Sequence, residues 1–203
     1  MKIAIDLNDV VRDFSNNFVK YYVERYNHEY NLDDFELYTN ELDIIFPFKS
    51  KLAYQKFLYE DYSYELYSKC PTCGRGIEQM LNEWTEKTLK DIDTDEPIEV
   101  MFVSPMEYGG SIGCTYMFLA KIGTKIRECY MPTDSTTIWD KCDVLITANP
   151  GLLGCKPEGK VSIKITTDYN KDLEADYTYN SLTKFLSDEN NTLKLINKTN
   201  DIC

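Results

Sequence analysis

The chain has 203 residues, with 22 lysines and arginines against 34 aspartates and glutamates, so its formal net charge is −12. Hydrophobic residues make up 43% of it, a proportion typical of globular proteins and not of disordered ones. At this length one core can support a single α/β domain that carries an insertion. The acidic balance, without any cluster of lysine or arginine, argues against direct binding to duplex nucleic acid or to an anionic membrane surface.

The apolar runs are short. None approaches the roughly 18 to 20 residues that a membrane-spanning helix needs, and Asp6 interrupts the first run too early for a signal peptide. The seven cysteines are an odd, scattered set, which fits reduced thiols better than a disulfide framework. We therefore expect a protein of the cytoplasm or of a virion, neither secreted nor embedded in a membrane.

Five apolar runs rich in β-branched residues alternate with stretches of helical spacing. The expected strands are residues 3–5, 100–103, 126–130, 144–146 and 161–165. The expected helices are residues 14–30, 76–89, 112–122 and 179–186, with Asp176 and Thr178 as candidate caps of the last. Near-continuous apolar strands that alternate with helices predict an α/β fold, a doubly wound, Rossmann-like parallel sheet.

The interval between the first two strands is unusually long. About 95 residues separate Asp6 from Val100, whereas a crossover between parallel strands needs only a few tens. We expect a core made of residues 1–13 and 97–203, and an inserted helical segment, residues 14–96, that leads into a core helix. Ten of the 16 tyrosines lie between Tyr21 and Tyr67, so the insertion has either a small aromatic core or a partner-binding face.

Polar residues follow three of the expected strands, at the sheet edge where parallel sheets bind ligands. Asp6 and Asn8 stand in Asp6-Leu7-Asn8-Asp9-Val10 after the first strand, Ser104 follows the second, and Thr147-Ala148-Asn149-Pro150 follows the fourth. This ordered set, with the insertion after the first strand, resembles the haloacid dehalogenase-like (HAD) superfamily, particularly its nucleotidase branch. The insertion stands where this family places its helical cap.

The resemblance implies a role for each motif position. Asp6 matches the nucleophilic aspartate, Asn8 the position of the second acid, and Ser104 the second-motif hydroxyl. Lys141 is the candidate nearest the fourth motif for the third-motif lysine, with Lys121 and Lys125 as alternatives. In active relatives Mg²⁺ lies between the nucleophile and the phosphate, because two anions do not otherwise approach each other.

The departures from the family pattern indicate a retired active site. Asn8 cannot titrate, and Thr147 and Ala148 replace the paired acids of the fourth motif. Loss of a general acid/base typically lowers the rate by about 10²- to 10⁴-fold. Two alternatives stay open: a displaced carboxylate restores the site, from Asp9, Asp140, Asp143 or Asp168, or Asp6 only accepts backbone N–H groups in its turn.

Two other patterns have plain interpretations. Cys70-Pro71-Thr72-Cys73 has the spacing of a zinc knuckle or a redox pair, but no second such pair accompanies it. We interpret it as a turn before the next helix, and His28 as a surface residue. The segment Gly109-Gly110-Ser111-Ile112-Gly113 leads into an expected helix and forms either a phosphate-binding turn or a flexible one.

Three functions remain. The first is a catalytically inactive HAD-like protein with a structural or protein-binding role, such as a virion component, that needs no cofactor. It contacts a protein partner or a second copy through the Tyr-rich insertion. The second is a Mg²⁺-dependent phosphatase or 5′-nucleotidase with Asp6 as nucleophile and Asp6 and Asp143 as metal ligands. The third is a non-catalytic nucleotide or sugar-phosphate binding protein that uses Asp6, Asn8 and Ser104.

Overall fold

The computed structural model describes residues 1–26, 35–90, 98–105, 107–188 and 190–191. Its centre is a sheet of six described strands in the order β3-β2-β1-β4-β5-β6, and every neighbouring pair is parallel. The predicted α/β fold class is confirmed. The strands are β1 (Lys2–Asp6), β2 (Glu99–Val103), β3 (Glu128–Tyr130), β4 (Val144–Thr147), β5 (Val161–Ile165) and β6 (Tyr177–Tyr179).

The register of the central strands defines the edge that matters for function. Asp6 is paired with Val103, and Ile5 is paired with Ile146. Asp6, Ser104 and Thr147 therefore lie at the same carboxyl edge of the sheet, as the sequence predicted. Asp143 precedes β4, and its side chain accepts a 2.8 Å hydrogen bond from the backbone N–H of Lys2, so it lies at the opposite, amino edge.

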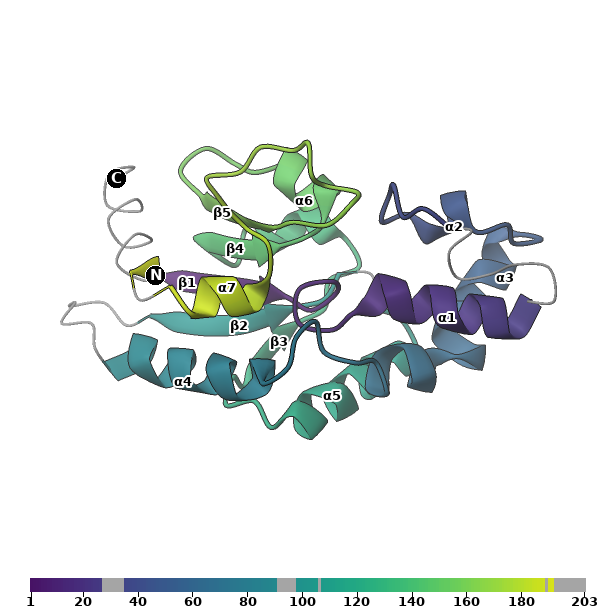
Figure 1. Cartoon of the computed structure of the whole chain (residues 1–203), viewed down its shortest axis with the longest axis horizontal. Helices are drawn as coiled ribbons and strands as arrows, with labels where there is room; N and C mark the ends of the chain where they lie inside the picture. The colour runs from purple at the N-terminus through teal and green to yellow at the C-terminus, as the bar shows by residue number, and fades with distance from the viewer. Residues whose placement is uncertain (27–34, 91–97, 106, 189, 192–203) are drawn as a thin grey trace.

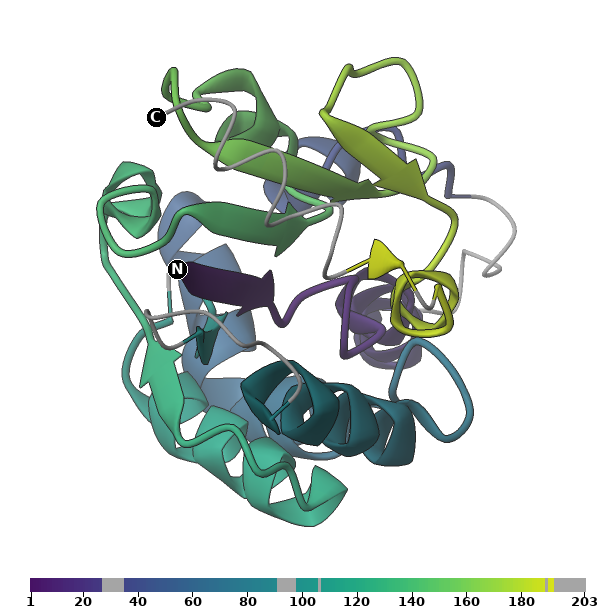
Figure 2. The ribbon, with the colours of Figure 1, turned by 90° about the vertical axis from the view of Figure 1, so that its left-hand side faces the viewer.

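Helices cover both faces of the sheet (Figures 1 and 2). One face packs against α4 (Ile77–Lys90), α5 (Gly110–Ile122) and α7 (Leu182–Leu186), with Ile3, Ile5 and Phe102 in its core. The other face packs against the turn η4 (Ser135–Ile138) and α6 (Pro150–Gly154), with Ala4 and Leu145 in its core. This alternation follows from the two-residue period of a strand.

The carboxyl-terminal part differs from the prediction. Tyr179 is the last residue of β6 and not the first residue of a helix, and α7 begins only at Leu182. The capping side chain is that of Ser181, which accepts the N–H of Lys184, so the predicted caps Asp176 and Thr178 were wrong. Residues 176–179 alternate polar and aromatic side chains, as an edge strand does. β6 itself has only three residues, which are too few for this alternation to predict a strand. The final residues, 192–203, lie outside the described part.

The insertion forms an aromatic cluster of its own. Its described helical elements are α1 (Phe14–Tyr26), α2 (Leu42–Ile45), α3 (Lys51–Lys56), η2 (Phe57–Asp61) and η3 (Tyr64–Ser68), which lie to one side of the sheet in Figure 1. Phe18 packs against Phe46 and Phe57 with ring centroids 5.1 and 5.3 Å apart. Tyr22 and Tyr67 are buried, so these tyrosines serve packing, while residues 27–34 of the insertion, His28 among them, lie outside the described part.

Candidate functional site

A tight turn follows β1 and shapes the carboxyl edge of the sheet. The N–H groups of Val11 and Arg12 both donate to the carbonyl of Leu7, at 3.0 and 2.9 Å. Asp9 adopts a positive φ of 57°, a conformation that aspartate tolerates better than most residues because its short side chain bonds locally. Its carboxylate does so here, accepting the N–H and the hydroxyl of Ser15 at 2.8 and 2.5 Å.

Asp6 lies at the end of β1, with only 1% of its surface exposed. Its Oδ2 accepts a 2.7 Å hydrogen bond from the hydroxyl of Thr147, the residue at the end of β4. Its Oδ1 is buried and finds no hydrogen-bond partner among the described residues. Burial raises the pKa of Asp6 to about 7, against the opposing effect of the Thr147 hydrogen bond. A substantial part of this carboxyl group is therefore protonated at neutral pH.

Arg12 fills the space between the ends of β1 and β2. Its side chain is fully buried, and its Nη2 lies 2.5 Å from Oε1 of Glu107. The same Nη2 donates to the hydroxyl of Ser104 at 3.0 Å, and Nη1 donates to the hydroxyl of Thr115 at 2.7 Å. A guanidinium group stays charged in proteins, so a permanent positive charge lies at the sheet edge where the sequence predicted the candidate site.

Asn8 is also engaged by Arg12. Its Oδ1 accepts a 2.6 Å hydrogen bond from Nε of Arg12, so the amide oxygen in the second-acid position is committed to a neighbour. Arg12 further packs its guanidinium carbon 4.8 Å from the ring centroid of Tyr67, in the insertion. The cation–π contact links the insertion to the core at this point.

The sequence analysis did not identify three residues of this network, Arg12, Glu107 and Thr115. Arg12 is separated from Glu107 and Thr115 by about 100 residues, and no local pattern joins it to them. Arg12 did carry a signal: it is a basic residue directly after the apolar pair Val10 and Val11, inside an acidic turn. A basic residue in such a turn is a signal that could have indicated a buried ion pair at this edge.

The end of β4 carries no acid. Thr147 donates to Asp6 and accepts the N–H of Asn149 at 3.0 Å, while Ala148 is fully buried and has no polar side-chain atom. Asn149 caps α6 by accepting the N–H of Gly151 at 2.8 Å. The buried amide of Asn170 donates to the carbonyl of Ala148 at 2.8 Å. This segment is held by hydrogen bonds that serve the turn.

The alternative acids are engaged or distant. Asp9 has both oxygens occupied, since Tyr169 adds a hydroxyl donor at 2.8 Å to the two bonds from Ser15. Asp140 and Asp168 are exposed. The structure does not bring Asp143 to Asp6, because Asp143 lies at the amino edge of the sheet and binds Lys160 at 3.1 Å. The predicted pair of metal ligands is therefore not assembled.

The candidate lysines do not enter this network. Lys141 is exposed, and its ammonium nitrogen lies 5.9 Å from the ring centroid of Tyr130. Lys121 is exposed on α5, and Lys125 forms an exposed ion pair with Glu86. The cation that the structure does bring to Ser104 is Arg12.

Comparison with known proteins places this architecture. No family model and no curated protein matches the chain. A solved structure described as a haloacid dehalogenase-like hydrolase, from Burkholderia xenovorans LB400, is similar over 95% of this chain and 97% of its own, with a TM-score of 0.60 and 9% identity. The chain has a HAD-like fold. At this identity the likeness concerns the fold, and function has to be argued from the site.

The HAD-like fold implies a Mg²⁺ ion at the carboxyl edge, and the residues present do not fit one. Mg²⁺ prefers several oxygen ligands in octahedral geometry, usually with more than one carboxylate. Here Asp6 contributes one unpaired oxygen, Asn8 is bound by Arg12, and Ala148 offers no donor. Among the described residues no three histidine, cysteine, aspartate or glutamate side chains gather to hold a metal.

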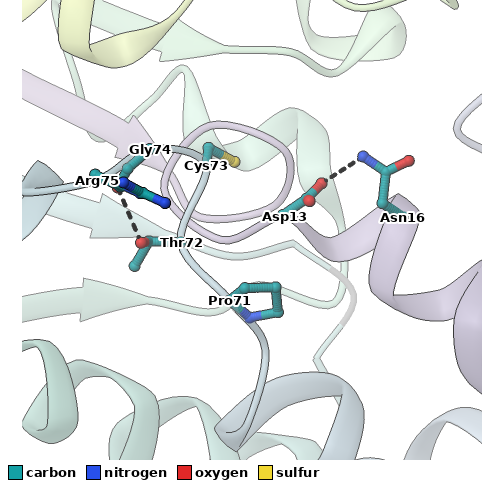
Figure 3. Close-up of a pocket in the computed structure, with 7 residues that line it drawn as sticks. All are labelled: Asp13, Asn16, Pro71, Thr72, Cys73, Gly74 and Arg75. Atoms are coloured by element: carbon teal, nitrogen blue, oxygen red, sulfur yellow. Dashed lines mark hydrogen bonds between the residues drawn. The ribbon is translucent and has the colours of Figure 1, made fainter.

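A separate pocket lies beside this edge, where residues 71–73 run antiparallel to residues 11–13 (Figure 3). Its volume is about 410 Å³ and its lining includes Asp13, Asn16 and Arg75. A neighbouring pocket of about 630 Å³ shares Asp13 and Asn16. Neither is lined by the strand-end residues.

The Cys70 and Cys73 segment forms part of that wall. Cys73 donates its N–H to the carbonyl of Val11 at 2.9 Å, and burial raises the pKa of the Cys70 thiol to about 12 and that of Cys73 as well. Both are therefore neutral thiols, as the turn interpretation expects.

Gly110, the first residue of α5, lies close to the backbone of the insertion. Gly109 has a positive φ of 56°. A Cβ added at Gly110 would lie 2.8 Å from the carbonyl oxygen of Tyr59, in η2. The close approach requires glycine at Gly110, which explains this position without a bound phosphate.

Among the described residues no helix is both long and apolar enough to span a bilayer.

Proposed function

We propose that this chain is a non-catalytic protein of HAD-like fold whose role is to bind another protein or a second copy of itself. The observation that carries the proposal is the position of Arg12. Its guanidinium holds Asn8, Ser104, Thr115 and Glu107 at the carboxyl edge, so a fixed cation and its partner carboxylate lie where a catalytic site would need room for a metal and a phosphate.

The chemistry of phosphoryl transfer is poorly served by this arrangement. Asp6 is the one candidate nucleophile there, and its raised pKa of about 7 leaves much of it neutral. Asn8 cannot protonate a leaving oxygen, a loss of about 10²- to 10⁴-fold by itself. The hydroxyl of Ser104 already donates to Glu107 at 2.7 Å, so it has no hydrogen left for a phosphate oxygen.

Exposed apolar side chains support a binding role. On the insertion, Tyr38 and Leu52 expose 59% and 73% of their surface, and beside it Tyr108 exposes 69%. On α5, Tyr116 and Met117 are about half exposed. Large aromatic and sulfur-containing side chains are enriched at protein interfaces. A subunit of a larger assembly, such as a virion, is one setting in which such a surface would be covered.

The test is phosphate release from a panel of nucleotides and other phosphomonoesters in the presence of Mg²⁺. We expect the wild type to release no more phosphate than a matched Asp6→Asn variant. Turnover by the wild type that Asp6→Asn abolishes would establish the competing function, a Mg²⁺-dependent phosphatase, and defeat the proposal.

Light scattering tests the self-association branch. We expect a mass above that of one chain, reduced to the monomer mass by Tyr116→Ser combined with Met117→Ser. A wild-type monomer at every concentration tested would contradict self-association and leave only a heterologous partner.

A further inference from the structure

Three hydrogen-bond donors converge on one oxygen of Glu107. Nη2 of Arg12 lies 2.5 Å from Oε1, the hydroxyl of Ser104 lies at 2.7 Å, and that of Thr115 lies at 2.9 Å. The donors come from the turn after β1, the end of β2 and α5. All four side chains are buried, with at most 4% of any residue exposed.

The direction of each bond is fixed by the number of hydrogens. A hydroxyl has one hydrogen to donate. The hydroxyls of Ser104 and Thr115 each accept from Arg12, at 3.0 and 2.7 Å, so their single hydrogens are free to donate to Glu107. The guanidinium thereby orients both hydroxyls toward Oε1, and three hydrogens meet at one point. This is the arrangement of an anion-binding site.

The three donors satisfy only one of the two carboxylate oxygens of Glu107. Its second oxygen, Oε2, is buried and has no hydrogen-bond partner among the described residues. An unpaired buried acceptor such as Oε2 is unfavourable. All three donors contact Oε1 instead, so the site binds one carboxylate oxygen and not both. Glu107 follows Ser104 by three positions, and this short connection holds its carboxylate at a high effective concentration beside the donors.

We propose that Arg12, Ser104 and Thr115 form a carboxylate-binding site, and that Glu107 is its tethered ligand, which closes the site to carboxylates from solution. The inference goes beyond the proposed function, because it concerns what fills the cleft. Its test measures no phosphate release, so either can fail while the other stands.

The experiment uses the full chain with Glu107→Ala. This substitution removes a CH₂ and a carboxylate, which are close to the atoms of acetate, and leaves the three donors in place. Thermal unfolding is followed while sodium acetate replaces sodium chloride at constant ionic strength. When acetate reaches tenfold above its Kd, we expect Tm to rise by about 3 to 5 °C. The wild type, whose site is filled, should show no such rise.

Two control variants complete the design. Glu107→Gln keeps the shape and an acceptor oxygen in the site, so acetate should not change its Tm. Glu107→Ala combined with Arg12→Met removes the cation, so acetate should again have no effect. If Glu107→Ala does not fold in chloride, its refolding yield is measured in acetate and in chloride, and a higher yield in acetate is expected. No response of Glu107→Ala to acetate, or an equal response in the variant without Arg12, would overturn the proposal.

Discussion

The protonation of Asp6 offers a direct probe of the site. Its pKa is raised from 3.8 to about 7 by burial, so the folded protein keeps this proton in a pH range where the unfolded chain has lost it. Between these two values the folded state binds more protons, and the free energy of unfolding therefore falls as pH rises. Above the folded pKa both states are ionised, and the dependence ends.

The Asp6→Asn variant removes this titration while keeping an oxygen that can accept from Thr147. From about pH 5 to about pH 8.5, the wild type should lose roughly 2 to 3 kcal/mol of unfolding free energy relative to the variant. Urea unfolding of both proteins at both pH values measures this double difference, in which other titrating groups cancel. Parallel pH profiles of the two proteins would contradict this expectation, since they would mean that Asp6 titrates alike in the folded and unfolded states.

Three further substitutions test the contacts around the site by urea unfolding. Arg12→Met should destabilise the fold by about 3 to 5 kcal/mol, because Glu107 is left buried without its partner. Adding Glu107→Gln should recover part of this loss. An effect of Arg12→Met below about 1 kcal/mol would mean that the buried ion pair contributes as little as an exposed one. Asp9→Ala should lower the free energy of unfolding by about 2 to 4 kcal/mol, because alanine tolerates the positive φ poorly and loses the bonds to Ser15. Asp9→Asn should lower it clearly less, because asparagine tolerates that φ and keeps an acceptor oxygen. Equal losses in the two variants would contradict this expectation. Asn170→Ala should cost about 2 to 4 kcal/mol, since it leaves the carbonyls of Ala148 and Ile165 unpaired, and a neutral result would contradict that role.

The sheet could be predicted from sequence because its signals are local. Residues 3–5 and 100–103 are continuous apolar runs, and such runs indicate strands buried on both faces. The polar residues that follow them, Asp6 and Ser104, fell at the carboxyl edge as expected. β6 could not be predicted, because three residues at an edge with mixed exposure carry too little periodicity.

At the carboxyl edge, the sequence could predict which acids are missing but not which residues take their place. Asn8 and Ala148 showed that acids were missing, because residue types are visible in sequence. What replaced them was not visible, since the Arg12–Glu107 pair joins residues 95 positions apart. Long-range ion pairs of this kind follow from the fold and not from spacing.

If the Arg12–Glu107 ion pair closes the carboxyl edge, that edge cannot hold a dication. Isothermal titration of the full chain with MgCl₂, at neutral pH and into the millimolar range, tests it most directly, with Asp6→Asn as the matched control. We expect no saturable heat in either protein. Saturable binding of Mg²⁺ by the wild type that is lost in Asp6→Asn would contradict this expectation.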